Sequence, residues 1–157
     1  MNDMNFTGKE LLVELINTAC KQTDPNDTVQ ILRDGLARLI AEKSVYLPEC
    51  VFEPVEGHYA RREIYRCAET GVTVVAMTWG PDQGTPIHDH CGLWCVEGVW
   101  QGKIEITNYE LVDDSPERCR FIRHETILAD AGSSGSLIPP HEYHTIHNPN
   151  PKQAAIS

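Results

Sequence analysis

Histidines are the residues of this sequence best suited to metal chemistry, and most of them fall into two clusters. The first cluster is the run His88-Asp89-His90. On a β-strand, residues two apart project to the same face, so these two imidazoles can share one metal ion. The alternative is a pair of surface histidines on an edge strand.

The second cluster contains His141, His144 and His147. A period of two places His144 on the face of Ile146, as expected of an inward residue, and puts the other two histidines outward or in turns. This parity favours His144 as a third ligand. The alternative is that all three histidines lie at the surface beside a proline-rich loop.

Two amphipathic helices are predicted ahead of the strands, in a helical part that covers residues 1–45. Thr7-Gly8-Lys9-Glu10 has the spacing of a capping box, and leucines and isoleucines then recur at helical spacing. A polar break over 20–27 follows. Asn26 or Asp27 can cap the second helix.

From about Val51 the pattern changes to short β-branched segments separated by Gly, Pro, Asp and Asn. Many short strands at this spacing favour a sandwich or a barrel over residues 48–157, within one domain of residues 1–157. The predicted strands cover 59–67, 72–79, 87–90, 94–99, 103–111, 118–124, 136–138 and 143–147, with a loop over 130–135.

The amino-acid composition disfavours some classes of binding partner. Lys plus Arg is 13 and Asp plus Glu is 23, a net charge of -10, which disfavours binding to nucleic acid or to an anionic membrane. No apolar run approaches the roughly 18 residues of a membrane span, and no signal peptide is recognised. We therefore expect a cytoplasmic protein with reduced cysteines.

The spacing around both histidine clusters resembles the two sequence motifs of the cupin superfamily. Cys95 stands where the first motif normally has a glutamate ligand. The resemblance implies a mainly β, cupin-type β-barrel or jelly roll preceded by two N-terminal α-helices. Three neutral imidazoles would keep the full charge of the ion and leave about three positions open on it. The matching positions are His88, His90, Gly102, Pro139, His144 and Asn148.

This pattern, with cysteine in place of glutamate, resembles the cysteine dioxygenase family of thiol dioxygenases. Tyr59-Ala60-Arg61 resembles the family's Tyr-x-Arg, Trp79-Gly80 precedes the first histidines at the family spacing, and Gln101-Gly102 follows them. The resemblance implies oxidation of L-cysteine to cysteine sulfinate by O2 at an Fe(2+) held by His88, His90 and His144. Arg61 would bind the substrate carboxylate with help from Tyr59, while Cys95 and Trp79 would stand behind the ligands.

The end of the sequence, Ala155-Ile156-Ser157, resembles the start of a strand that carries a catalytic His and Tyr in the family. These residues would fall beyond Ser157. We interpret the segment as a strand that has been cut short.

Two other functions fit the same residues. One is a dioxygenase for 3-mercaptopropionate or another small thiol, although Arg61 favours cysteine because related mercaptopropionate enzymes commonly have Gln there. The other is a non-catalytic cupin module that holds a metal. Three imidazoles would also take Zn, Ni or Co. By strand alternation Arg62 is predicted to be an ordinary surface charge, and the sequence predicts no oligomeric state.

Overall fold

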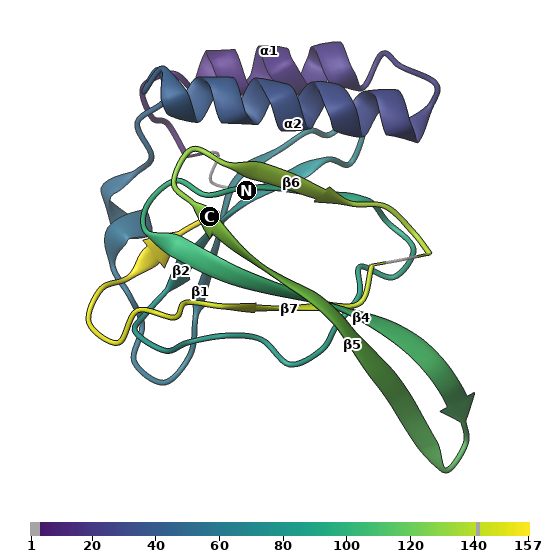
Figure 1. The fold of residues 1–157 in the computed structure, drawn as a ribbon. Helices are drawn as coiled ribbons and strands as arrows, with labels where there is room; N and C mark the ends of the chain where they lie inside the picture. The colour runs from purple at the N-terminus through teal and green to yellow at the C-terminus, as the bar shows by residue number, and fades with distance from the viewer. Residues whose placement is uncertain (1–3, 141) are drawn as a thin grey trace.

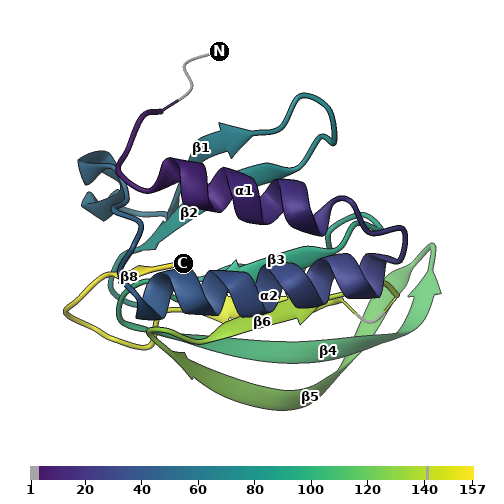
Figure 2. The same cartoon turned by 90° about the horizontal axis from the view of Figure 1, so that it is seen from above.

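Two helices open the chain and cover one side of the strands (Figures 1 and 2). Residues 4–140 and 142–157 are described by the structure, a computed structural model. Helix α1 (Lys9–Ala19) and helix α2 (Pro25–Ala41) each bury one apolar face, and strand residues complete the shared core. Neither helix is long and apolar enough to cross a membrane. Core residues of these helices and strands include Leu12, Ile16, Leu32, Leu39, Ile64, Ala76 and Ile156.

Both helices begin differently from the prediction. Helix α1 follows Gly8, which has a φ of 82° and forms no side-chain cap, so the predicted capping box is wrong. Helix α2 starts at Pro25 because Asp24 accepts a hydrogen bond from the backbone N–H of Asn26 at 2.8 Å. A proline at the first helical position has no N–H to leave unpaired, so it can extend the helix back to this cap.

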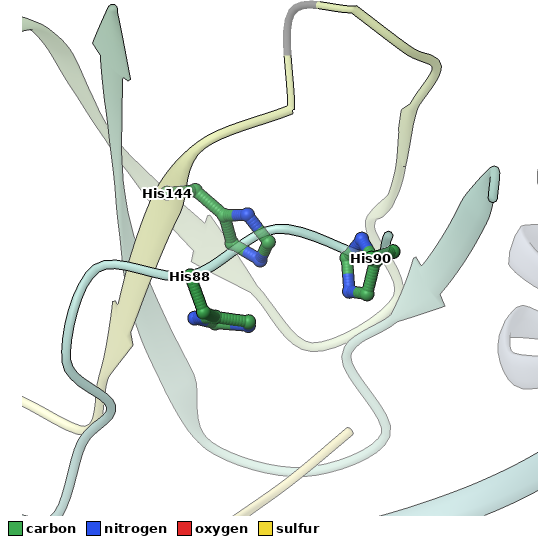
Figure 3. A group of neighbouring side chains, drawn as sticks. All are labelled: His88, His90 and His144. Carbon is green, nitrogen blue, oxygen red and sulfur yellow. The ribbon is translucent and has the colours of Figure 1, made fainter. Parts of the chain in front are cut away.

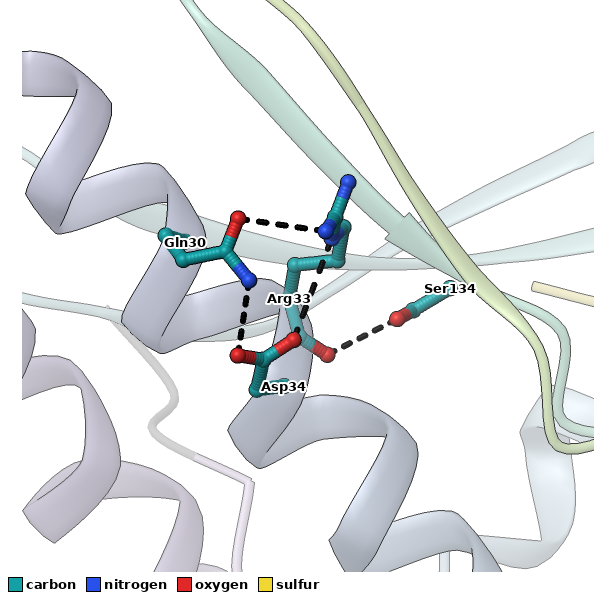
Figure 4. A network of polar contacts seen from close by, with 4 residues as sticks. All are labelled: Gln30, Arg33, Asp34 and Ser134. Carbon is teal, nitrogen blue, oxygen red and sulfur yellow. Dashed lines mark hydrogen bonds and ion pairs between the residues drawn. The ribbon is translucent and has the colours of Figure 1, made fainter.

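A hydrogen bond joins α2 to strand β6 (Ser134–Leu137), as Figure 4 shows. The Ser134 hydroxyl donates to the backbone carbonyl of Arg33 at 2.8 Å. On the helix itself, the Gln30 side chain donates to Asp34 at 2.7 Å and accepts from Arg33 at 3.1 Å. The helix therefore meets the sheet through its backbone as well as through its apolar face.

The rest of the chain is mainly antiparallel β-structure, which confirms the predicted fold class. The sheets have the strand orders β1-β2-β8, β3-β6 and β5-β4-β7. The short 3-10 helix η1 (Glu49–Phe52) precedes them. The remaining strands are β1 (Ala60–Arg66), β2 (Thr73–Trp79), β3 (Cys95–Gly98), β4 (Lys103–Ser115), β5 (Arg118–Asp130), β7 (His144–His147) and β8 (Ala155–Ile156).

The predicted strand over 87–90 is not a regular strand. The segment 83–88 does run beside β7, but its pairing is interrupted because Pro86 has no N–H to donate. The Thr85 hydroxyl accepts from the backbone N–H of Ile146 at 3.0 Å, in place of a backbone carbonyl. Gly84 allows this segment to approach β7 closely, since a Cβ at position 84 would lie 2.7 Å from the Ile146 carbonyl oxygen.

Strands β4 and β5 extend beyond their predicted ranges and form a long hairpin that reaches away from the helices (Figure 1). The pairing shifts register between Thr107 and Tyr109 and again between Leu111 and Asp113. Each shift interrupts the alternation that sequence analysis relies on. The pattern therefore predicts shorter strands than the two that form.

Asn148, which follows β7, joins segments that are distant in sequence. It is fully buried, and its side-chain amide donates to the backbone carbonyls of Trp79 and Gly80, each at 3.0 Å, and of Gln153 at 2.8 Å. Its side-chain oxygen accepts from the backbone N–H of Asn150 at 3.0 Å. One buried amide thus holds the end of β2 beside the loop that leads to β8.

We expect Asn148→Ala to lower the free energy of unfolding by at least about 2 kcal/mol, because it leaves buried backbone carbonyls without a donor. Chemical denaturation followed by circular dichroism measures this loss. The exposed Asn17→Ala on α1 is the matched control and should change the free energy by less than about 0.5 kcal/mol. Equal effects of the two substitutions would contradict this role of Asn148.

Candidate metal centre

The backbone brings the two histidine clusters together. His88 and His144 exchange both backbone hydrogen bonds, at 3.1 and 3.0 Å, in an isolated antiparallel bridge. Residues directly opposite each other on an antiparallel pair project to the same face. Their ring centroids accordingly lie 4.2 Å apart, although the two residues are 56 positions apart in the sequence.

His90 completes the group from the loop that follows. Its ring centroid lies 5.6 Å from that of His88 and 5.1 Å from that of His144. The chain then turns sharply at Cys91 and Gly92, which have φ values of 55° and 78°. Figure 3 shows the three rings arranged around a common space.

Backbone carbonyls fix the tautomers of two of these rings. His88 Nδ1 lies 3.1 Å from the Pro86 carbonyl oxygen, and His144 Nδ1 lies 2.7 Å from the Glu142 carbonyl oxygen. A carbonyl oxygen can only accept, so each Nδ1 carries the proton and donates it. The Nε2 atom of each ring is left with a free lone pair, the form in which imidazole binds a metal.

The surroundings favour the neutral form of two of the rings, those of His144 and His90. Burial lowers the pKa of His144 from an ordinary value of 6.5 to about 4, with His88 and His90 acting in the same direction. Burial is also the main cause that lowers the pKa of His90, helped by His88 and Arg61 and opposed by nearby carboxylates. Neutral imidazoles are required for metal binding, so these two rings favour the form that binds an ion.

The three histidines fit a single metal ion. One ligand atom from each lies within 4.8 Å of the other two. Three nitrogens bound to one ion at about 2.1 Å lie roughly 3.0 to 3.6 Å apart, so the side chains would move toward one another by roughly 1 to 2 Å on binding. The group of His88, His90 and His144 could therefore hold a metal ion, and the chemistry of its donors does not by itself select which metal.

Tyr59, Arg61 and Trp79, also singled out from the sequence, are not in this histidine group. Tyr59 packs on Trp79 with ring centroids 4.8 Å apart, and the indole N–H of the fully buried Trp79 donates to the Ser157 hydroxyl at 2.9 Å. Arg61 is exposed, and it lines a hollow of about 600 Å³ together with Tyr59. None of the three histidines lines that hollow. The substrate-binding roles of Tyr59 and Arg61 stay predictions.

Arg62 is not the ordinary surface charge that alternation predicts. It is half-buried and donates to the Thr78 hydroxyl at 2.8 Å and to the Glu53 carbonyl at 2.7 Å. These two hydrogen bonds link β1 to β2 and to the residue that follows η1. Arg61, its neighbour on the opposite face, has no hydrogen bond or ion pair to the residues that the structure describes.

Cys95 is a half-buried thiol whose neutral form is favoured. Burial, followed by the charges of Glu97 and Glu142, raises its pKa to about 12. Its side chain lines a cavity of about 390 Å³, whose wall also includes Glu97 and Asn108. Cys95 is not in the group of possible metal ligands, and the described cysteines are all free.

The remaining histidines of the second cluster are outside the group. His147 lies opposite Glu105 of β4 and forms a bridge to Gly84, so it is not among the possible metal ligands. The prediction that His141 does not bind metal concerns a residue outside the described part of the chain.

Glu142 is the residue of this site that sequence reasoning missed. Its side chain is only 4% exposed, and its carboxylate accepts from the backbone N–H groups of His90 and Gly92, each at 3.3 Å. It also lies 3.7 Å from His90 Nδ1. Its parity with His144 was the available signal, since residues two apart share a face.

Comparisons with known proteins support the fold and not an activity. No protein-family profile matches the sequence. A Thermus thermophilus protein named TT1209 is similar in structure, with a TM-score of 0.51 and 14% identity, over 69% of this chain and 86% of that one. A cupin superfamily protein from Desulfitobacterium hafniense follows, with a TM-score of 0.48 and 13% identity, over 70% and 84%. Drosophila melanogaster CENP-C bound to CAL1 has a TM-score of 0.45 and 16% identity, over 67% and 74%.

The depressed pKa of His144 predicts how stability depends on pH. Between pH 6.5 and about 4 the unfolded chain protonates this histidine while the folded chain does not, so the metal-free protein should lose stability as the pH falls through that window. Denaturant titrations at several pH values measure the loss. His144→Gln should flatten this part of the curve, and the exposed His124→Gln should not. An unchanged slope in His144→Gln would contradict the assignment.

Proposed function

We propose that this chain is a thiol dioxygenase that converts L-cysteine and O2 to cysteine sulfinate, with iron as its cofactor. In the overall reaction, RSH + O2 → RSO2H, both oxygen atoms are added to the sulfur. The observation that carries the proposal is the group of three buried or half-buried imidazoles with no carboxylate among its ligand atoms. Such a ligand set leaves the charge of a divalent ion uncompensated and so favours an anionic substrate.

The three histidines are the residues that would hold the iron. A bound ferrous ion would supply the redox chemistry with O2 and the positive charge that favours a thiolate. His88 and His144 present Nε2 because their Nδ1 protons are committed to backbone carbonyls. The protein thus sets the direction of these ligands before any ion binds.

Arg61 is the residue that we propose for the substrate carboxylate. It is exposed, and it lines the hollow of about 600 Å³ described above. A guanidinium can bind a carboxylate through two parallel hydrogen bonds, which lysine cannot reproduce. Tyr59 lines the same hollow and is proposed to assist. Cys95, a neutral thiol, is proposed to stand behind the ligands rather than bind the metal.

The first test of this function is metal binding with thiol-dependent oxygen uptake. Wild-type protein loaded with Fe(2+) should consume O2 when cysteine is added, and His144→Ala should lose both iron and uptake. His147→Ala on the same strand is the matched control and should keep both. Iron analysis and an oxygen electrode give the two readouts.

The outcomes separate the alternatives. Faster uptake with 3-mercaptopropionate than with cysteine would assign the chain to that thiol. Bound iron with no uptake for any small thiol would make it a non-catalytic metal-binding module. Loss of iron from His147→Ala but not from His144→Ala would show that the ligand assignment is wrong.

The second test concerns substrate selection by Arg61. We expect Arg61→Ala to raise KM for cysteine by about ten- to a hundredfold, because a charge-assisted pair with the carboxylate is lost. Cysteamine, which has no carboxylate, should be affected much less. Arg61→Lys keeps the charge but not the two parallel hydrogen bonds, so its KM for cysteine should lie between those of the wild type and Arg61→Ala. Equal losses for cysteine and cysteamine would contradict carboxylate binding by Arg61.

A further inference from the structure

We propose that Glu142 is the positioning residue of the metal centre: it aims His90 at the ion through Nδ1, and it supplies the negative charge that the three imidazoles lack. The proposal rests on the metal site of the proposed function and names a role within it. Three observations support it: two concern the carboxylate of Glu142, and one concerns its backbone carbonyl.

The first observation is the contact between the Glu142 carboxylate and the loop that carries His90. The carboxylate accepts from the backbone N–H groups of His90 and Gly92 at 3.3 Å each. Chain separations of 52 and 50 residues make these long-range ties. Because the loop turns sharply just after His90, two bonds to its backbone fix the position from which the ring projects.

The second observation is an unsatisfied ring nitrogen. His90 Nδ1 is buried without a hydrogen-bond partner, and the nearest carboxylate oxygen, Oε2 of Glu142, lies 3.7 Å away. His88 and His144 both have their Nδ1 atoms paired with backbone carbonyls. A small movement of the His90 ring toward Glu142 would satisfy Nδ1 in the same way and leave Nε2 for the ion.

The third observation is that Glu142 also holds His144, through its backbone. The Glu142 carbonyl oxygen accepts from His144 Nδ1 at 2.7 Å. One residue therefore acts on two of the three ligands, with its main chain directing one ring and its side chain the other.

The negative charge of Glu142 gives a chemical reason for its place beside the histidines. The side chain is 4% exposed, and within the described residues no lysine or arginine forms an ion pair with it. A buried carboxylate is costly unless a positive charge or hydrogen bonds compensate it. The three neutral imidazoles would hold an ion whose charge is uncompensated, and Glu142 lies directly behind one of them. One carboxylate would offset only part of the charge of a divalent ion, so the ion would still favour an anionic substrate.

The experiment measures metal binding without turnover. Co(2+) is added to metal-free wild type, Glu142→Gln and Glu142→Ala, and the visible absorption of the bound ion gives both affinity and ligand geometry. We expect the Kd for Co(2+) to rise about 10- to 100-fold in both variants, with shifted absorption bands. Glu110→Gln is the matched control, because Glu110 also contacts a histidine, His124 at 3.0 Å, but on the exposed hairpin. It should leave affinity and spectrum unchanged.

A second measurement needs no variant. Nitrogen-15 NMR of the histidine rings in the metal-free wild type should show His90 as the Nδ1–H tautomer, as it should His88 and His144. An Nε2–H tautomer at His90, or an unchanged Kd and spectrum in Glu142→Gln, would overturn the proposal. Failure of thiol oxidation in a protein that binds Co(2+) normally would instead overturn the proposed activity and leave the role of Glu142 standing.

Discussion

The candidate metal centre depends on one pair of backbone hydrogen bonds, those that His88 and His144 exchange. This pair fixes which residues of two distant segments lie opposite each other, and hence that two imidazoles share a face. Everything else supports that register. Gly84 lets the incoming segment lie against β7, Thr85 replaces the donor–acceptor pattern that Pro86 interrupts, and Asn148 anchors the chain just beyond β7. Helix α2 packs on strands β3 and β6, and both helices share a hydrophobic core with strand residues, which stabilises the sheets.

The sequence carried enough local information to predict the architecture. Apolar residues at helical spacing and then short β-branched segments were sufficient for two helices followed by antiparallel strands. Strand parity and the spacing to Pro139 and Asn148 also favoured His144 over His147, and the ring of His144 lies 4.2 Å from that of His88, although its role as a ligand stays a prediction. The architecture was predictable because it depends on periods of the backbone that neighbouring residues reveal.

The misses depend on contacts that no local period encodes. Glu142 meets the backbone of His90 and Gly92 across about 50 residues of chain, and only the fold determines that meeting. Alternation predicts which face of a strand a side chain lies on, and on that basis Arg62 was predicted to be a surface charge. Alternation does not predict which hydrogen-bond acceptors lie on that face, and here the Thr78 hydroxyl is one. Helix α2 begins at Pro25 because Asp24 caps it. The polar break before the helix contains several residues that can act as a cap, so the sequence does not identify which one does.

The commitment of two Nδ1 protons to main-chain carbonyls also has an evolutionary consequence. Carbonyl oxygens are present whatever the side chain, so substitutions at Pro86 or Glu142 that keep the backbone path leave the acceptors of His88 and His144 in place. Insertions and deletions are a different matter. A shift of β7 by a single residue would bring Tyr143 or Thr145 opposite His88 and turn His144 to the other face. The orientation of His88 and His144 should therefore tolerate substitution of the residues that supply these carbonyls, whereas that of His90 depends on the Glu142 side chain. None of the three rings would keep its place after a change in the length of the two paired segments.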